Sequence, residues 1–246
     1  MWVICKKEWA HFFSSLTGYL ALAAFFVLNG LLFFVFPDTS LLEDGYASLT
    51  PFFRWVPLVM MVFIPIITMR SFSDEYRSGY YEMLRTLPIA SWQLVLGKFL
   101  GALLIVWAAL LPTLLYAFTL QQLSVSGGID LGGVVGSYIG LLLLGAMITA
   151  IGIAASSLTA NTVVAFIIGL LISLFLYSGF DSISKLAGLP AESEYYVQML
   201  GMKFHYSSIS RGVMDTRDLF YFIAVTAYFL FITQHRMEHS SAPQRI

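Results

Sequence analysis

The chain has 246 residues, of which 59% are apolar and only 11% charged, and its formal net charge is −1. A typical soluble domain carries about 25% charged residues, so the polar side chains here are too few to cover a soluble fold. The composition excludes a soluble globular protein, a disordered chain and a protein that binds nucleic acid through a basic face. The single cysteine, Cys5, excludes a disulfide framework and a cysteine-based zinc or iron–sulfur site.

Residues 1–13 are expected to form a helix that lies on the membrane surface. Trp2, Trp9, Phe12 and Phe13 fall on one face at helical spacing, while charged residues fall on the opposite face. An apolar face with Trp at headgroup depth is typical of interfacial helices. The alternative is a plain positively charged flank of the first membrane span.

Six long apolar runs predict an all-α integral membrane protein with six transmembrane helices. One span needs about 20 apolar residues, because about 30 Å of hydrocarbon is crossed at about 1.5 Å per residue. The expected spans are residues 16–36, 52–69, 92–120, 132–156, 162–180 and 218–235. The fourth and fifth share one uncharged run, which the polar residues 156–161 divide with a turn. Continuous runs without period-two alternation exclude a membrane β-barrel.

The distribution of basic residues predicts that both termini are cytoplasmic. With the N-terminus inside, the inner segments hold eight of the thirteen Lys and Arg residues of the chain. Cytoplasmic loops of membrane proteins are enriched in these two residue types. Residues 70–88 then lie in the cytoplasm, and residues 181–217 form a long extracytoplasmic loop.

Residues 70–88 are expected to form two short helices separated by Gly79 and ended by Pro88. Ser71, with Asp74 three residues later, resembles a capping box that would begin the first helix. The charges alternate in sign and aromatic residues are interleaved with them, which favours a surface that binds another protein. The alternative is a solvated connector held by local salt bridges.

Small residues recur at every fourth position on spans four and five. They are Gly132, Gly136 and Gly140 on span four, and Ala165, Gly169 and Ser173 on span five. Such faces allow helix backbones to approach closely in lipid. Two interpretations remain open at this point: the faces pack helices within one subunit, or they form an interface with a second subunit.

Two motifs resemble those of the permease subunits of type-2 ABC exporters. The first comprises Arg70, Phe72, Asp74, Glu75, Arg77, Gly79, Glu82, Leu84, Pro88, Trp92, Val95, Gly97, Lys98 and Phe99. The second comprises Phe204, Ser208, Arg211, Gly212, Asp215, Arg217, Asp218 and Tyr221. The resemblance covers essentially the whole chain, and the pair of motifs is most similar to gliding-motility permeases of the GldF type.

The resemblance implies a single transmembrane permease domain over residues 1–246, in the bacterial inner membrane. Residues 1–13 would be its elbow helix, and residues 70–88 would contain the coupling helix that binds a cytoplasmic ABC ATPase dimer. The implied coupling residues are Arg70, Asp74, Glu75, Arg77, Gly79, Glu82, Leu84, Arg85 and Pro88. A second permease copy or a paralogous membrane subunit would complete the transporter. Its activity would be export or force transmission, in gliding motility.

Residues 181–217 are too long for a simple connector. Their second half is rich in aromatic residues and is expected to lie against the outer leaflet or to form a short re-entrant pair. Arg211 with Asp215, and Arg217 with Asp218, are expected to form ion pairs that tie the loop to span six. Together with Gly212, these residues are the candidate contact for a periplasmic partner, and the alternative is a passive lid.

No catalytic residue, metal site or cofactor is expected in this chain. Gly97 and Lys98 form the only Gly-Lys pair, and the first Gly and the Ser or Thr of a phosphate-binding loop are missing around it. ATP and Mg²⁺ are therefore expected on the partner ATPase. The alternative function is a membrane scaffold without transport activity, which docks a cytoplasmic partner through residues 70–88.

Overall fold

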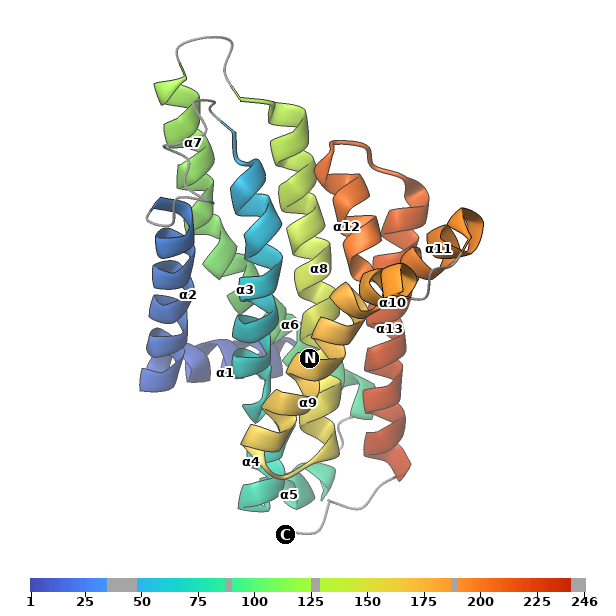
Figure 1. Cartoon of the computed structure of the whole chain (residues 1–246). Coiled ribbons are helices and arrows are strands. Elements are labelled where there is room, and N and C mark those ends of the chain that lie inside the picture. The colour runs from blue at the N-terminus through green and yellow to red at the C-terminus, as the bar shows by residue number, and fades with distance from the viewer. Residues whose placement is uncertain (35–47, 87–89, 125–128, 187–189, 240–246) are drawn as a thin grey trace.

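The computed structural model describes residues 1–34, 48–86, 90–124, 129–186 and 190–239, and the regular structure in these ranges is entirely helical (Figure 1). The helices are α1 (Trp2–Ser14), α2 (Leu16–Phe34), α3 (Thr50–Thr68), α4 (Arg70–Ser78), α5 (Tyr80–Thr86), α6 (Ser91–Leu110), η2 (Leu111–Thr113), α7 (Leu114–Leu123), α8 (Leu131–Leu158), α9 (Thr162–Leu174), η3 (Phe175–Gly179), α10 (Phe180–Leu186), α11 (Ala191–Gln198), α12 (Met202–Ser210) and α13 (Thr216–His239).

Six helical stretches of the described residues are long and apolar enough to cross a membrane, which confirms the expected all-α fold with six spans. They cover Leu16–Phe34, Thr50–Ser78, Ser91–Gln122, Leu131–Leu158, Thr162–Lys185 and Thr216–His239. The second stretch is longer than expected, because α4 continues α3 through a helical Met69. The third contains the short 3₁₀ segment η2 at Pro112, where a backbone N–H donor is missing.

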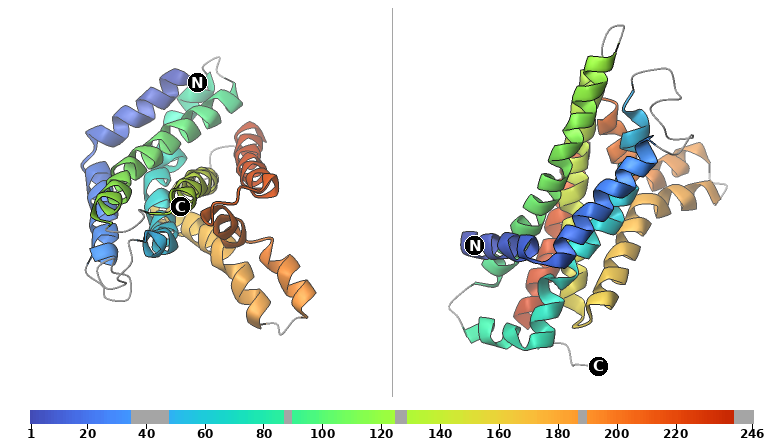
Figure 2. Two further views of the ribbon diagram at one scale, coloured as in Figure 1. Left: turned by 90° about the horizontal axis from the view of Figure 1, so that it is seen from above. Right: turned by 90° about the vertical axis from the view of Figure 1, so that its left-hand side faces the viewer.

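Helix α8 forms the centre of the bundle, as the view from above shows (Figure 2). Within its most apolar window 78% of the residues are buried, against 17% for α13 and 22% for the stretch that begins with α9. Leu141, Leu144 and Met147 of α8 are fully buried and belong to one apolar core with Met60 and Ile64 of α3. The peripheral helices α2, α9 and α13 keep apolar side chains on the outside, as a lipid-facing surface requires.

Helix α1 lies across the bundle and packs against α6 (Figure 2). The contact is close because α6 carries two glycines at this point. A Cβ atom on Gly101 would lie 2.7 Å from Cβ of Glu8, and one on Gly97 would lie 2.9 Å from Cβ of Ile4. The expected N-terminal helix is therefore present, and its position on a membrane surface stays a prediction.

Toward the end opposite α4 and α5, the described residues between α9 and α13 form the π-helical turn η3 and the short helices α10, α11 and α12 (Figure 1). Helix α12 packs alongside α8 and buries Met202, His205, Tyr206 and Ile209. Whether this segment lies against the outer leaflet or forms a re-entrant pair stays a prediction.

Candidate functional site

The junction between α3 and α4 is built around Ser156 of α8. Its hydroxyl accepts hydrogen bonds from the backbone N–H groups of Phe72 (2.9 Å) and Ser73 (3.2 Å), and it donates to the carbonyl of Met69 (3.0 Å). These bonds satisfy backbone groups that the bend between the two helices would leave unpaired. The expected capping box at Ser71 is wrong, because no side chain caps α4 and the helix continues directly from α3.

Three of the four aromatic residues of α4 and α5 face the protein interior, whereas Tyr80 is exposed. Phe72, Tyr76 and Tyr81 are buried in one apolar cluster. The hydroxyl of Tyr76 donates to Sδ of Met237 (3.4 Å), and that of Tyr81 donates to the carbonyl of the same residue (3.2 Å). Tyr76 and Tyr81 therefore attach the segment to α13 and are not part of an exposed surface, whereas Tyr80 and Met83 of the expected interleaved surface are exposed.

Gly79 separates α4 from α5, as expected. Its φ of 75° lies in the left-handed region, where a residue with a side chain is strained, and its N–H donates to the carbonyl of Tyr76 (3.3 Å). This glycine therefore ends α4 and turns the chain so that α5 lies across the end of the bundle (Figure 1).

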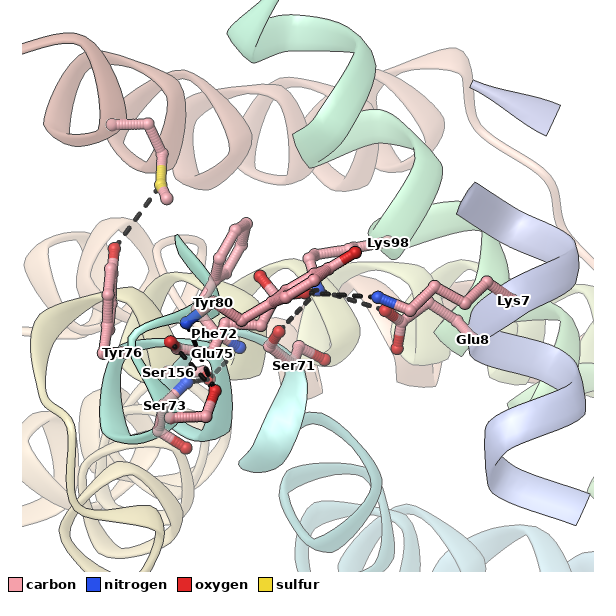
Figure 3. A network of polar contacts seen from close by, with 12 residues as sticks. Lys7, Glu8, Ser71, Phe72, Ser73, Glu75, Tyr76, Tyr80, Lys98 and Ser156 are labelled. Atoms are coloured by element: carbon pink, nitrogen blue, oxygen red, sulfur yellow. Dashed lines mark hydrogen bonds and ion pairs between the residues drawn. The ribbon is translucent and has the colours of Figure 1, made fainter. Parts of the chain in front are cut away.

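Lys98 of α6 forms the polar centre of this region (Figure 3). Its Nζ atom lies 2.7 Å from Oε1 of Glu75, 3.0 Å from Oε1 of Glu8 and 2.6 Å from the carbonyl oxygen of Ser71. The three ammonium hydrogens thus have three acceptors. The side chain is only 1% exposed, so this is a buried charge whose donors are all satisfied.

The cluster of Glu8, Glu75 and Lys98, with Ser71, joins three helices, and we call it the Lys98 junction. Glu8 belongs to α1, Glu75 to α4 and Lys98 to α6. Lys7 adds a second positive charge, 3.7 Å from Oε1 of Glu75 and 4.7 Å from the ring centroid of Tyr80. Removal of one partner from a buried ion pair leaves an uncompensated charge, at a cost of about 3–5 kcal/mol. Movement of α4 relative to α1 or α6 must therefore break strong contacts.

The predicted coupling residues divide into an internal and an external group. Glu75 is internal, and Asp74 is half-buried. Arg77 and Glu82 are exposed, and Arg70 is exposed and donates to Oγ1 of Thr17 (3.1 Å). Pro88 and the side chains of Leu84 and Arg85 lie outside the described residues.

The exposed face of this segment is formed by side chains from α4 and α5. It consists of Arg77, Ser78, Tyr80, Glu82 and Met83, and we call it the distal face. A cleft of about 580 Å³ lies beside it, between α1 and α4, and is lined by side chains of both signs. The geometry is that of a small charged platform fixed to the bundle through buried contacts.

A family model described as "ABC-2 family transporter protein" matches residues 2–234. The chain belongs to the ABC-2 transporter family. No curated protein matches it. The protein is therefore a multi-pass membrane subunit of an ABC transporter, a transport component and not an enzyme by itself, and such permeases generally pair with a cytoplasmic ABC ATPase.

The small-residue faces of this ABC-2 permease pack helices within the subunit. A Cβ atom on Gly136 would lie 2.5 Å from the carbonyl oxygen of Ile209, and one on Gly140 would lie 3.1 Å from the ring of Tyr206, so this face receives α12. Gly169 faces Gly152 of α8. Ala165 and Ser173 are also buried, whereas Gly132 is exposed.

The predicted outer ion pairs of the permease are wrong, because each acidic residue has another role. Asp215 accepts from the backbone N–H of Arg217 (3.0 Å) at the start of α13, and Nε of Arg211 donates to the carbonyl of Ser207 (3.2 Å). Asp218 is buried, and its Oδ1 lies 2.7 Å from Nδ1 of His205.

The sequence did not predict two features of residues 199–218. Nε2 of His205 lies 2.8 Å from the carbonyl of Met199, so both ring nitrogens of this histidine lie beside oxygen atoms. No local spacing connects positions 205 and 218. Gly212 has a φ of 82°, and a Cβ atom on it would lie 3.2 Å from the backbone of Gly132, so the residues after α12 approach the small-residue face of α8 closely.

Proposed function

We propose that this permease couples ATP hydrolysis by a separate cytoplasmic ABC ATPase dimer to export, or to force transmission, across the bacterial inner membrane. The ATPase dimer binds the distal face and carries the ATP and Mg²⁺. Both termini and α4–α5 lie on the cytoplasmic side, α1 serves as the elbow helix, and a second permease copy or paralogue completes the transporter. The observation that carries the proposal is the Lys98 junction, because it connects the distal face to α1 and α6.

The path of coupling follows from rigid connections. Helix α4 continues α3, and the Ser156 hydroxyl ties their junction to α8. The Tyr76 and Tyr81 hydroxyls tie the same segment to α13. A displacement of the distal face by the closing ATPase is therefore passed to α3, α8 and α13 as well as to α1, and the bundle responds as a unit.

We further propose a role in gliding motility, with a periplasmic partner at the outer loop. The support is the similarity of residues 204–222 to the corresponding segment of GldF-type permeases. The described part of this segment presents Arg211 and Arg217 on the surface, next to the small helices α11 and α12.

The test is the charge-reversal variant Glu82→Lys on the distal face. A desolvated interface charge left without its partner costs about 2–5 kcal/mol, which is at least about a tenfold loss of affinity. We expect the variant to lose copurification of the ATPase from detergent extracts, while its abundance in the membrane stays unchanged.

The matched control is Glu192→Lys, an exposed glutamate of α11 at the other end of the bundle. It should retain the ATPase. Unchanged copurification in Glu82→Lys would contradict the docking assignment. If the protein that is lost carries no ATP-binding cassette, the scaffold function is the correct one.

A further inference from the structure

A cavity of about 730 Å³ lies between α3, α8, η3 and α12, at the end of the bundle opposite the distal face. Its polar and charged lining includes Arg54, Asp130, Tyr177, Lys203 and Ser207. The volume lies within the range of about 300–1,000 Å³ that is usual for sites of small ligands. None of the motifs that connect the chain to its family accounts for this cavity.

The side chain of Tyr177 lines this cavity. The residue is 6% exposed, and among the described residues its hydroxyl has no hydrogen-bond partner. It lies in η3, a π-helical turn that interrupts the span between α9 and α10. Such turns appear frequently at functional sites. A hydroxyl without a protein partner can donate a hydrogen bond to a ligand in the cavity.

Two of the three charged side chains that line the cavity have a polar partner. Lys203 is held by Asp181 at 2.8 Å, and Oδ1 of Asp130 accepts from the backbone N–H of Gly132 at 3.1 Å. Arg54 has no ion pair or hydrogen bond within the part of the chain that the structure describes. The cavity therefore offers one guanidinium and one phenol hydroxyl, which together favour an anionic group with acceptor oxygens.

The remaining wall of the cavity carries apolar residues together with the serine and threonine residues 48, 50, 137, 178 and 210. Leu49, Phe53, Leu58, Ile129 and Val134 line it, and Trp55 lies beside Arg54 on α3. A free inorganic anion would leave this wall in contact with water, whereas an acyl chain would cover it. The ligand that fits both parts of the lining has an anionic head and an apolar tail.

We propose that the cavity binds an amphipathic anion, with a phosphate headgroup at Arg54 and Tyr177 and an acyl chain along the apolar residues of the wall. An anionic phospholipid of the outer leaflet, of the phosphatidylglycerol type, has this chemistry. The proposal is independent of ATPase coupling, since the site lies at the other end of the bundle and is tested without the ATPase.

The experiment measures lipid binding to the purified full chain through the fluorescence of Trp55. Brominated phosphatidylglycerol and brominated phosphatidylcholine are titrated in mixed detergent micelles, and the Trp55 signal is the difference between the parent chain and Trp55→Phe. We expect brominated phosphatidylglycerol to reach half-quenching at a mole fraction about three- to fivefold lower than brominated phosphatidylcholine does, as one ion pair of modest strength predicts. Arg54→Gln should remove this preference.

The control is Arg217→Gln, which removes an exposed arginine from the same end of the molecule but outside the cavity. It should retain the full preference. Tyr177→Phe, a second variant with nearly the same volume, should reduce the preference about twofold. Millimolar inorganic phosphate should not displace the lipid.

Three results would overturn the proposal. The first is equal quenching by the two lipids in the parent chain. The second is an undiminished preference for phosphatidylglycerol in both Arg54→Gln and Tyr177→Phe. The third is a loss of this preference in Arg217→Gln as large as the loss in Arg54→Gln. Displacement of the lipid by inorganic phosphate would show that the site recognises a free anion, and this result also contradicts an amphipathic ligand.

Discussion

The Lys98 ammonium contacts acceptors from two other helices, and its burial determines how much these contacts contribute. Exposed ion pairs contribute about 0–1 kcal/mol, because water and salt screen them. A buried charge without a partner costs several times more. The buried carboxylate of Glu75 likewise depends on Lys98 as its counter-charge, since its Oε2 atom is buried and has no hydrogen-bond partner among the described residues.

We expect Lys98→Met to lower the free energy of unfolding by about 3–5 kcal/mol, because Glu8 and Glu75 then lose their buried counter-charge and only the exposed Lys7 remains near Glu75. The control Lys203→Met removes a half-exposed lysine that pairs with Asp181, and it should cost about 0–1 kcal/mol. Thermal unfolding of the detergent-purified chain measures both effects. Equal losses in the two variants would show that the junction contributes no more than a surface pair.

Two carboxylates share the single Lys98 ammonium, which gives a further check on the same junction. Adding Glu75→Gln to Lys98→Met removes one of the unpaired charges, so the double variant should be more stable than Lys98→Met alone. A double variant that is less stable than Lys98→Met would indicate that packing, and not charge, holds α1, α4 and α6 together.

At the scale of helices, the contact between α8 and α12 depends on the absence of a side chain at one position. Gly136 leaves no room for a Cβ atom, because the backbone oxygen of Ile209 would be 2.5 Å away. A Cβ atom on Gly132, one turn earlier, would meet only Oδ1 of Asp130, at 3.4 Å. The two glycines belong to the same small-residue register, but substitution by alanine is expected to have opposite effects on stability at the two positions.

Gly136→Ala should displace α12 and lower the melting temperature, whereas Gly132→Ala should leave it unchanged or raise it slightly. The gain is expected because alanine is favoured over glycine in a helix by about 1 kcal/mol. Thermal unfolding of both variants tests this contrast. Equal destabilisation would show that the register forms a contact other than the one with α12.

The membrane spans could be predicted from the sequence because hydrocarbon thickness sets the length of an apolar run. The roles of Ser156 and Lys98 could not be predicted in the same way. Ser156 lies in the segment that was expected to form a turn, but it bonds to residues 83 and 84 positions away. Lys98 and Glu8 are 90 positions apart, so no local pattern indicates that they meet.

The short helices of residues 181–217 could not be predicted from the sequence either. The length of residues 181–217 indicated that this segment is structured, whereas its helices are too short to produce a clear periodic pattern. The π-helical turn η3 has no compositional signal either. The cavity around Tyr177 and the pairing of His205 with Asp218 depend on tertiary contacts, so they could not be predicted from the sequence.

For the whole molecule, the orientation in the membrane decides which end meets the ATPase. We expect a cysteine at Ser78 to react with an impermeant maleimide only after cell lysis, and a cysteine at Glu192 to react in intact cells. The parent chain is the control, because Cys5 is buried and burial raises the pKa of its thiol, which lowers its reactivity. Reversed labelling would place α4 and α5 outside.

Site-specific photo-crosslinking in living cells tests most directly whether the distal face receives an ATPase. A photoreactive amino acid is placed at Glu82 on the distal face or at Tyr196 on α11, and captured proteins are identified by mass spectrometry. We predict that position 82 captures a protein with an ATP-binding cassette and that position 196 does not. Capture of such a protein at position 196 alone, or of a protein without this cassette at position 82, would contradict the account.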